Sequence, residues 1–361
     1  MPAFPVMEPG AVKGPEALKQ GVSELARSLG FALCRVAPAL APPHAGAFRR
    51  WLAEGCAGEM AWMERNAERR ADPRLVLPGA QSVVVLALPY FQGAGTSGER
   101  IARYAWNEDY HDVIAPKLRR IDAFLQEHGG VQRGYVDTGP VLERDFGALA
   151  GVGWHGKSTM LVHPELGTWF FLAEVLTTLA LPPDPPLPER CGRCTRCLAA
   201  CPTGALTGPC QLDARRCIAY LTIEHKGSIP EALRPLVGGR IYGCDACAAA
   251  CPWNRFARAS REAAFAARPA VQLGLRELLA LDEEGFRTLF RGSPIKRVKW
   301  RGLLRNVCVA LGNTGTPEDI PALKVAAADP EPLIAEHAGW ALEEIRRRAG
   351  QPSSRRKAAG S

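Results

Sequence analysis

The sequence predicts an α+β chain in three parts, and three observations support this. Helical and strand patterns alternate across residues 1–180, which indicates an α/β-like domain. Two runs of closely spaced cysteines fall within residues 181–260, which indicates a small domain built around metal. Helical periodicity dominates residues 261–348 and predicts an all-α region, and a basic tail over residues 349–361 is expected to be disordered.

The composition is that of a soluble globular protein with two or three domains, with 361 residues that are 47% hydrophobic and 23% charged. The first residues lack a basic segment followed by an apolar one, so we expect no signal peptide. The most apolar stretch, Trp169–Leu181, is too short to span a bilayer. With 12 cysteines and no export signal, we expect a cytoplasmic protein whose thiolates bind metal. The net charge of +8 is compatible with a polyanionic partner.

The first half contains four helical and four extended patterns. Leu18, Val22 and Leu25 recur at helical spacing, whereas the apolar run Ser82–Leu88 ends at Pro89 and predicts a buried strand. The predicted helices cover Pro15–Gly30, Phe48–Arg70 with a break near Gly55–Gly58, Tyr110–His128 and Val141–Ala150. The predicted strands cover Phe31–Val36, Ser82–Leu88, Val131–Val136 and Thr168–Leu179, and Gly93–Gly98 is a predicted loop. This alternation is compatible with an α/β or an α+β domain.

The second half begins with the proline-rich segment Leu181–Pro188, which predicts a stiff polyproline linker. After the cysteine runs, helices are predicted over Leu303–Gly312, Pro321–Ala328 and Pro332–Arg348. Ala310-Leu-Gly is echoed by Ala341-Leu at a spacing near that of HEAT-type helix pairs, so we expect the C-terminal region to be HEAT-like.

The first cysteine run has the spacing C-x2-C-x2-C-x3-C-P, and the second repeats this pattern without its first cysteine. This is the bacterial ferredoxin spacing, in which three cysteines of a run bind one iron–sulfur cube and the fourth binds the other. Eight thiolates in two interlocked sets disfavour structural zinc, which needs four at looser spacing. A disulfide framework is disfavoured because nothing marks the chain as secreted.

The spacing rule assigns ligands to two [4Fe–4S] clusters. The first cluster takes Cys191, Cys194, Cys197 and Cys251. The second cluster takes Cys201, Cys244, Cys247 and one further thiolate. We favour Cys217 for that position, because the plausible helix Leu212–Arg216 carries it back toward the cysteine runs. Cys210 lies in a loop and is interpreted as a bystander.

The segment Gly151–Ser158 matches two phosphate-binding patterns, G-x-G-x-x-G and G-x4-G-K-S, the latter with Lys157. Both patterns require a strand before the loop and a helix after it. Here a helix precedes and an extended segment follows, so nucleotide binding is disfavoured. The glycines either allow a close approach to a cofactor or form a bend in a β-corner.

Asp137 and His111 are candidate functional residues, and the sequence supports a functional role better for Asp137 than for His111. Asp137 ends a strand before a Thr-Gly-Pro turn, where burial could raise its pKa and make it a proton donor, but it could equally cap the helix Val141–Ala150. The sequence around His111, Asp109-Tyr-His, resembles the start of a motif that supplies histidine to cobalt. Because Ile114 occupies the glycine position of that motif, we interpret His111 as a surface or capping residue.

Several motifs together resemble one enzyme family. They are Ala102–Ala105, Asp109–His111, Gly134–Arg144, Gly151–Met160, both cysteine runs, Cys217–Glu224, Arg240–Cys247, Cys251–Asn254, Ser293–Arg297 and Leu303–Asn306. From about Glu16 to Arg348 the chain resembles the epoxyqueuosine reductases. The resemblance implies a cobalamin-dependent enzyme with two [4Fe–4S] clusters, related to reductive dehalogenases. Such an enzyme reduces the epoxide of epoxyqueuosine at the wobble position of tRNA.

The resemblance also implies roles for individual residues. Asp137 becomes the general acid, and Tyr104 a second catalytic candidate. The implied corrinoid or pocket residues are Met60, Arg103, Asp137, Thr138, Gly139, Ser158, Thr159 and Met160. The chain departs from the expected pattern at Ser158, where asparagine is expected, and at His155, where an apolar residue is expected.

A basic stretch beside Trp300 is the expected RNA contact, with a solvated helix face as the alternative. Its members are Lys296, Arg297, Lys299, Arg301 and Arg305. The expected partners are a tRNA anticodon stem-loop and an unidentified electron donor, for a chain expected to be monomeric. The competing hypotheses are a reductive dehalogenase-like enzyme acting on a small molecule, a non-enzymatic electron-transfer protein, and an ATPase that uses Lys157.

Overall fold

The computed structural model describes residues 14–93 and 100–350, and within them a four-stranded sheet organises the N-terminal half. Its strand order is β1 (Leu33–Pro38), β2 (Ser82–Pro89), β6 (Phe170–Thr177) and β3 (Gln132–Tyr135). All neighbouring strands in this sheet are antiparallel, which decides between the two predicted classes in favour of α+β. The four predicted strands are confirmed. Residues 94–99, which include most of the predicted loop, lie outside the described residues.

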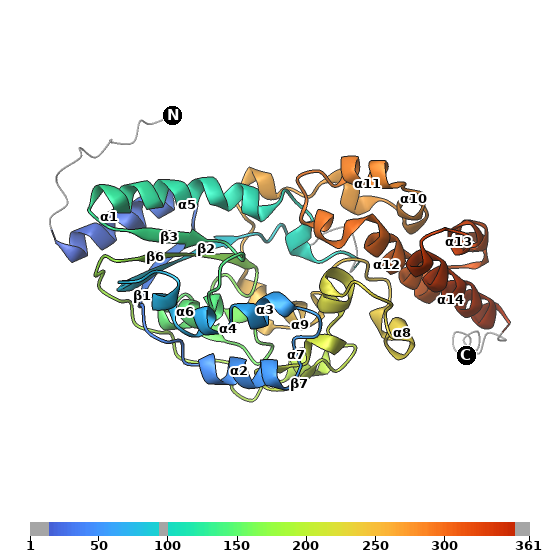
Figure 1. The fold of residues 1–361 in the computed structure, drawn as a ribbon, viewed down its shortest axis with the longest axis horizontal. Helices are drawn as coiled ribbons and strands as arrows, with labels where there is room; N and C mark the ends of the chain where they lie inside the picture. The colour runs from blue at the N-terminus through green and yellow to red at the C-terminus, as the bar shows by residue number, and fades with distance from the viewer. Residues whose placement is uncertain (1–13, 94–99, 351–361) are drawn as a thin grey trace, which may run out of the picture.

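Helices cover both faces of the sheet (Figure 1). On one face, α1 (Pro15–Ser28) and α5 (Tyr110–Glu127) pack against alternate residues of β2, such as Val84 and Leu86. The other face, with Val83 and Val85, packs against α6 (Glu143–Leu149). Because β2 is buried on both sides, its sequence is a continuous apolar run rather than an alternating one.

The predicted helical stretch Phe48–Arg70 is three short helices: α2 (Ala45–Ala53), α3 (Ala61–Arg65) and α4 (Ala67–Ala71). Gly55 and Gly58 separate the first two, with φ angles of 66° and 60° that favour glycine. The predicted break is therefore confirmed.

The phosphate-loop motif lies in a β-hairpin formed by β4 (Trp154–His155) and β5 (Leu161–Val162). A Cβ atom on Gly153 would lie 2.6 Å from the Val162 carbonyl oxygen, so the hairpin itself requires glycine there. The Lys157 ammonium donates to the Gly192 carbonyl at 2.6 Å. A strand rather than a helix follows the motif, so the geometry of a nucleotide-binding loop is missing; the glycines lie in a β-hairpin, and their approach to a cofactor stays a prediction.

The cysteine runs lie in a segment of short elements beneath the sheet. These are α7 (Arg196–Ala199), β7 (Leu206–Gly208), β8 (Gln211–Leu212), α8 (Arg234–Val237) and α9 (Ala246–Ala249). The proline-rich linker is fixed to the edge of the sheet, because Asp184 accepts a hydrogen bond from the Val36 N–H and pairs with Lys19 at 3.0 Å.

The C-terminal region is helical, as predicted, and lies at one end of the molecule (Figure 1). Its helices are α10 (Leu275–Leu279), α11 (Glu283–Leu289), α12 (Lys299–Thr314), α13 (Ile320–Ala327) and α14 (Pro332–Ala349). α12 packs on α14 through buried residues such as Val307 and Ala338. The same core contains Ile101 and Tyr242, which form a β-bridge, so the helical region also encloses segments from earlier in the chain. The predicted tail, from residue 351, lies outside the described residues.

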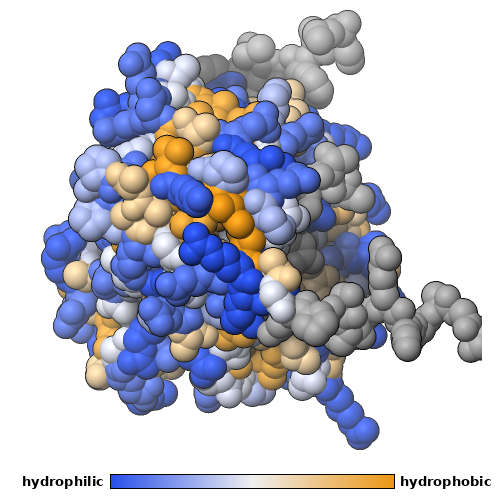
Figure 2. Space-filling model, turned by 90° about the vertical axis from the view of Figure 1, so that its right-hand side faces the viewer, coloured by the Kyte–Doolittle hydropathy of each residue, from blue (hydrophilic) through white to orange (hydrophobic). Residues whose placement is uncertain are grey.

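The surface at this end is mostly hydrophilic, with a narrow apolar band (Figure 2). None of the helices in residues 14–93 and 100–350 is both long and apolar enough to cross a membrane.

Arg305 is not an RNA contact, and that prediction was wrong. Its side chain on α12 is completely buried. The guanidinium donates to the carbonyl oxygens of Leu221, His225 and Gly227 at 2.7–2.9 Å and to the amide oxygen of Asn306. Arg305 therefore joins the helical region to the segment between the cysteine runs.

We predict that Arg305→Met lowers the free energy of unfolding by about 3 kcal/mol, because it leaves several buried carbonyl groups without a donor. The matched control Arg301→Met removes a half-exposed arginine of the same helix and should change it by less than about 0.5 kcal/mol. Urea unfolding measures both, and equal effects would contradict the structural role of Arg305.

Candidate active site

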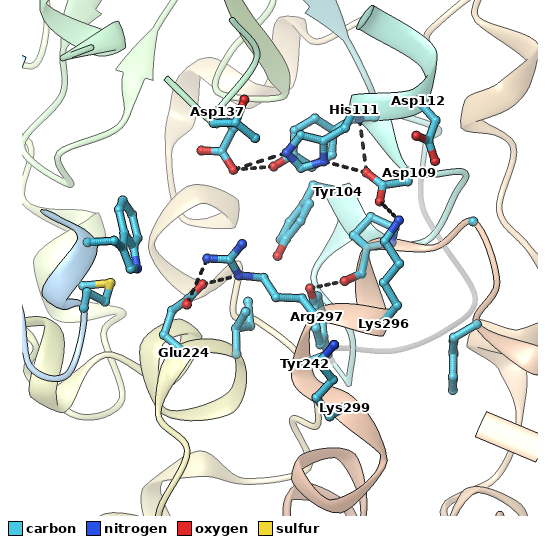
Figure 3. Close-up of a pocket in the computed structure, with 18 of the residues that line it drawn as sticks. Tyr104, Asp109, His111, Asp112, Asp137, Glu224, Tyr242, Lys296, Arg297 and Lys299 are labelled. Atoms are coloured by element: carbon cyan, nitrogen blue, oxygen red, sulfur yellow. Dashed lines mark hydrogen bonds and ion pairs between the residues drawn. The ribbon is translucent and has the colours of Figure 1, made fainter. Parts of the chain in front are cut away.

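A large cavity lies between the sheet domain and the C-terminal helices, and its volume is about 1560 Å³ (Figure 3). Its lining includes the α3–α4 segment, Tyr104 and the start of α5, the turn after β3, Glu224 and Tyr242 near the cysteine runs, α11 and the segment leading into α12. The residues that argue for chemistry are Tyr104, Asp109, Tyr110, His111, Asp137, Glu224, Lys296, Arg297 and Lys299.

Asp137 projects into this cavity just after β3, with its side chain 59% exposed. Its Oδ2 accepts a hydrogen bond from the Tyr110 hydroxyl at 2.6 Å. Its backbone, at φ 59°, is held by an N–H donated to Glu143 Oε1 at 2.8 Å. The helix-capping alternative is wrong, because α6 begins at Glu143 and is preceded by Leu142. The expected burial is also absent, so the carboxyl group is open to a ligand.

His111 lines the cavity, so its interpretation as a surface or capping residue was wrong. Asp109 caps α5 by accepting from the His111 N–H. The imidazole Nδ1 lies 2.7 Å from Asp109 Oδ1, and Nε2 lies 3.8 Å from Asp137 Oδ2. Lys296 pairs with the other Asp109 oxygen at 2.8 Å. Burial opposes ionisation of Asp109, but the hydrogen bonds from His111 and Lys296 outweigh it and lower its pKa.

Three tyrosines provide neutral hydroxyl groups around Asp137. Burial raises the pKa of Tyr110, and the negative charge of Asp137 raises it further, so Tyr110 remains a hydrogen-bond donor. Burial likewise raises the pKa values of Tyr104 and Tyr242 above the ordinary value. Tyr104 was predicted from the sequence as a catalytic candidate, but Tyr110 was not. Tyr110 nevertheless lies beside His111 in the motif Asp109–His111, which the sequence had indicated.

The basic residues divide by position. Lys296, Arg297 and Lys299 line the cavity (Figure 3), whereas Arg301 lies outside its lining and pairs with Glu331 at 3.6 Å. Arg297 donates two hydrogen bonds to Glu224, at 2.7 and 3.0 Å. Further arginines from α4 and from the end of α11 reach the same cavity: Arg69, Arg70, Arg287 and Arg291.

A second cavity of about 430 Å³ shares Met60, Trp62, Arg70 and Asp137 with the first. Its wall is largely aromatic and methionine-rich, with Thr159 among its polar residues. The predicted cofactor residues Met60, Asp137, Thr138 and Thr159 thus lie at one or both cavities.

The remaining predicted cofactor residues do not line either cavity: Arg103, Gly139, Ser158 and Met160. Arg103 donates to the Gly93 carbonyl at 2.6 Å and lies over the faces of Trp106 and Trp169. Ser158 is buried in the hairpin. A Cβ atom on Gly139 would collide with the Tyr135 ring, so this glycine lets the turn after β3 fold back on its strand.

The cysteine thiols group in the two sets that the spacing predicts. Burial raises the pKa of Cys251, and neighbouring thiolates raise it further, namely those of Cys191, Cys197 and Cys194. Burial raises the pKa of Cys247 to about 12, with contributions from Cys217, Cys244 and Cys201. Cys217, the uncertain eighth ligand, therefore lies with the second set.

The arrangement of thiols differs from that of a zinc site. Four sulfurs around one zinc ion lie about 3.8 Å apart. In residues 14–93 and 100–350, the one group of three or more ligating side chains that converges on a single ion position contains no cysteine. Cys210 contacts the Gly156 carbonyl at 3.6 Å, and burial and the nearby Cys191 and Cys197 thiolates raise its pKa, so its interpretation as a bystander stays a prediction.

Glu174 is a buried acid that the sequence analysis missed as a functional residue. It is completely buried in β6, and neither carboxyl oxygen has a hydrogen-bond partner within the described structure. Burial raises its pKa well above the ordinary value, and the charge of Glu143 raises it further. Burial also raises the pKa of Glu143 to about 7. Because Glu143 holds the Asp137 backbone, two acids with raised pKa values lie directly behind the Asp137 turn.

A domain with two interlocked thiol sets, next to a large polar cavity with a carboxyl group, defines an iron–sulfur oxidoreductase. Family models match a 4Fe-4S double cluster binding domain over residues 190–254 and "Epoxyqueuosine reductase QueG, DUF1730" over residues 70–138. The epoxyqueuosine reductase of Xanthomonas campestris is 41% identical over 90% of this chain and 95% of its own length. That of Escherichia coli K12 is 38% identical, over 92% and 90%. The chain belongs to the epoxyqueuosine reductase family.

Solved structures agree with this family assignment. A crystal structure of epoxyqueuosine reductase with an epoxyqueuosine-modified tRNA stem loop superposes with a TM-score of 0.83 and 33% identity, covering 91% of this chain and 90% of that one. The enzyme from Streptococcus thermophilus gives 0.82 and 28%, covering 93% and 91%. Family membership removes the non-enzymatic electron-transfer protein and the ATPase from the competing hypotheses.

We predict that Glu174→Gln flattens the pH dependence of stability. Glu174 has a raised pKa in the folded state, so at low pH it is protonated and its burial is tolerated. As the pH rises above the ordinary value of 4.5, the unfolded chain loses this proton more easily than the folded one, and the fold is destabilised. The effect continues past about pH 7, where Glu143 also titrates. Between about pH 5 and pH 8 the wild type should lose roughly 1–2 kcal/mol more than the variant. Urea unfolding at each pH measures this. The exposed control Glu165→Gln should behave as wild type, and parallel curves for all three proteins would refute the interpretation.

Proposed function

We propose that this chain reduces the epoxide of epoxyqueuosine at the tRNA wobble position, with Asp137 as proton donor, two [4Fe–4S] clusters and cobalamin. The observation that carries the proposal is the position of Asp137. Its exposed carboxyl group lies where a cavity with basic residues meets a second cavity of mixed lining, bounded in part by the segment between the cysteine runs. Proton donor, RNA surface and electron source thus meet at one place.

The reaction explains why these parts are needed together. Converting an epoxide to an alkene breaks two carbon–oxygen bonds, consumes two electrons and two protons, and releases the oxygen as water. The clusters deliver electrons one at a time. Asp137 supplies a proton to the departing oxygen, and the Tyr110 hydroxyl and His111 fix the direction of the carboxyl group. Solvent reaching the exposed Asp137 restores its proton for the second transfer.

Cluster ligation follows the two thiol sets. The first cluster is held by Cys191, Cys194, Cys197 and Cys251, and the second by Cys201, Cys217, Cys244 and Cys247. Cys217 packs in the same apolar cluster as Met60, which lines both cavities. The second cluster therefore lies immediately behind the cavity wall.

The second cavity and its border with the larger one are the proposed corrinoid site. Its methionine and aromatic side chains suit the faces of a large planar ring, and Thr159 and Arg144 offer polar contacts to the edge. Met60 and Thr159 would hold the group, and Asp137 would lie at its border with the larger cavity. When bound, cobalamin supplies a strongly reducing cobalt centre. The chain's own role is to exclude water from that side and to hold the proton donor on the other.

The RNA surface is proposed around the cavity rim. Lys296 forms an ion pair with Asp109, and Arg297 forms one with Glu224. These two residues therefore fix the position of the cavity rim and also give it positive charge. Lys299, at φ 63°, has no ion pair with another described residue. A relative of 33% identity was solved with an epoxyqueuosine-modified tRNA stem loop, which supports tRNA as the substrate here. Another, from Bacillus subtilis, has its aspartate catalytic loop swung out of the active site, and we propose that the exposed Asp137 turn has the same freedom.

We predict that Asp137→Asn lowers turnover on epoxyqueuosine-modified RNA by at least about 100-fold, because asparagine keeps the shape and the contact with Tyr110 but cannot donate an acidic proton. Iron content and RNA affinity should be unchanged. The control Asp112→Asn alters an exposed acid at the same cavity and should retain near wild-type turnover. An active Asp137→Asn enzyme would remove Asp137 from its proposed role.

We predict that Lys299→Glu weakens binding of an anticodon stem-loop by about tenfold and reduces the slope of log affinity against log salt by about one unit. The control Lys324→Glu reverses an exposed lysine of α13 that does not line the cavity, and should have little effect. Filter binding at several salt concentrations measures both. Equal effects of the two variants would place the RNA elsewhere.

A further inference from the structure

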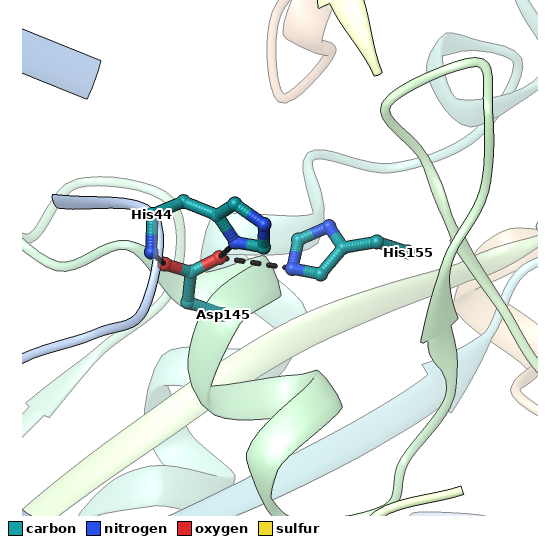
Figure 4. Close-up of side chains that lie close together, drawn as sticks. All are labelled: His44, Asp145 and His155. Carbon is teal, nitrogen blue, oxygen red and sulfur yellow. Dashed lines mark hydrogen bonds and ion pairs between the residues drawn. The ribbon is translucent and has the colours of Figure 1, made fainter. Parts of the chain in front are cut away.

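Two histidines and an aspartate from separate parts of the sheet domain meet on the wall of the second cavity (Figure 4). His44 precedes α2, Asp145 lies in α6 and His155 lies in β4. Asp145 Oδ1 lies 2.8 Å from His44 Nδ1 and 2.9 Å from His155 Nε2. The three ligand atoms all lie within 4.8 Å of one another, and the two rings meet edge to face.

The charge of this trio is balanced by one cation, either a proton on an imidazole or a metal ion between the three side chains. The Asp145 side chain is only 4% exposed, and its ion partners in the described part of the chain are these two imidazoles. Its second oxygen accepts the His44 backbone N–H at 3.0 Å, which fixes the orientation of the carboxylate. A buried carboxylate with two neutral imidazoles carries a net negative charge, which a metal ion would neutralise.

His155 Nε2 lies 2.9 Å from Asp145 Oδ1, a distance compatible with a hydrogen bond or with two ligands of one ion. His155 Nε2 is buried and touches the carboxylate, yet it makes no aligned hydrogen bond within the described structure. In a metal site the nitrogen lone pair points at the ion between the ligands rather than at the neighbouring oxygen. The trio therefore presents two nitrogens and one oxygen to a shared point.

The ligand types select the ion. Two imidazoles and one carboxylate are the donor set of zinc sites that keep an open position, and also suit other divalent transition metals, whereas magnesium and calcium prefer oxygen alone. Because all three residues line the second cavity, the open position faces that cavity and can take water or a ligand oxygen.

We propose that His44, Asp145 and His155 form a divalent transition-metal site, with Zn²⁺ as its occupant, separate from the cysteine clusters and open to the second cavity. It does not depend on the proposed function, because it requires neither Asp137 nor a bound corrinoid.

The test is anoxic titration of the full chain, carrying its iron–sulfur clusters, with Zn²⁺ against a chromophoric chelator. The wild type is expected to bind one zinc that His155→Leu and His44→Gln bind more than about 100-fold more weakly, since losing a ligand exceeds the 10–100-fold effect of losing an outer partner. Cluster absorbance monitored in parallel shows that zinc has not displaced iron. Two histidine variants are used because His44 is half-exposed whereas His155 is more buried. A folding defect caused by His155→Leu would not be shared by His44→Gln.

Zinc-edge X-ray absorption supplies the second readout. The proposal expects nitrogen and oxygen ligands at about 2.0 Å and no sulfur at about 2.3 Å. Cys210→Ser, which alters the thiol on the same cavity wall, should leave zinc binding intact. Sulfur coordination, equal affinity of wild type and His155→Leu, or no zinc binding would each overturn the proposal and leave the trio as a hydrogen-bonded group.

Discussion

The exchange of cysteines between the two runs is the constraint on which the rest of the structure depends. Cys201 ends the first run but groups with the second thiol set, whereas Cys251 ends the second run but groups with the first set. Two proposed clusters that share ligands in this way hold both runs, and the chain between them, in one position. Asn254 joins the second cysteine run to the sheet domain. Its amide oxygen accepts a hydrogen bond from the Thr168 N–H at 2.7 Å, and its amide nitrogen donates to the Ala248 carbonyl oxygen.

The cavities follow from this arrangement. The segment between the runs supplies Cys210, Leu212 and Ala214 to the second cavity, while Met60 from the sheet domain packs beside Cys217. Arg305 holds the same segment from the other side through its carbonyl groups. In the proposed mechanism, electrons would come from the cysteine segment behind the cavity wall, and protons would come from the open side where Asp137 lies. This separation suits a reduction in which electrons and protons are delivered to different atoms of the substrate.

Local patterns predicted the features that depend on local chemistry. The apolar run of β2, the cysteine spacing and the helical periodicity of α12 and α14 are each set by neighbours in sequence, and each was predicted. Asp137 was found because it follows a strand, but its alternatives could be separated only when α6 was seen to begin at Glu143.

The residues whose roles the sequence did not predict correctly depend on tertiary contacts. Arg305 belongs to a basic stretch, and composition cannot distinguish a buried arginine that satisfies carbonyl groups from a solvated one. His111 faces the cavity because Asp109 both caps α5 and binds its ring, which depends on the position of Lys296 far along the chain. Glu174 did leave a signal, as the single acid in an otherwise apolar strand, but the partner that explains it, Glu143, lies on another element.

Iron content of two cysteine variants tests the central claim most directly. After anoxic reconstitution, the wild type and Cys210→Ser should each hold about eight irons, whereas Cys217→Ser should lose the second cluster and fall to about four with the first cluster intact. Eight irons in Cys217→Ser, loss of iron in Cys210→Ser, or zinc in place of iron in the wild type would contradict the crossed ligation on which this account depends.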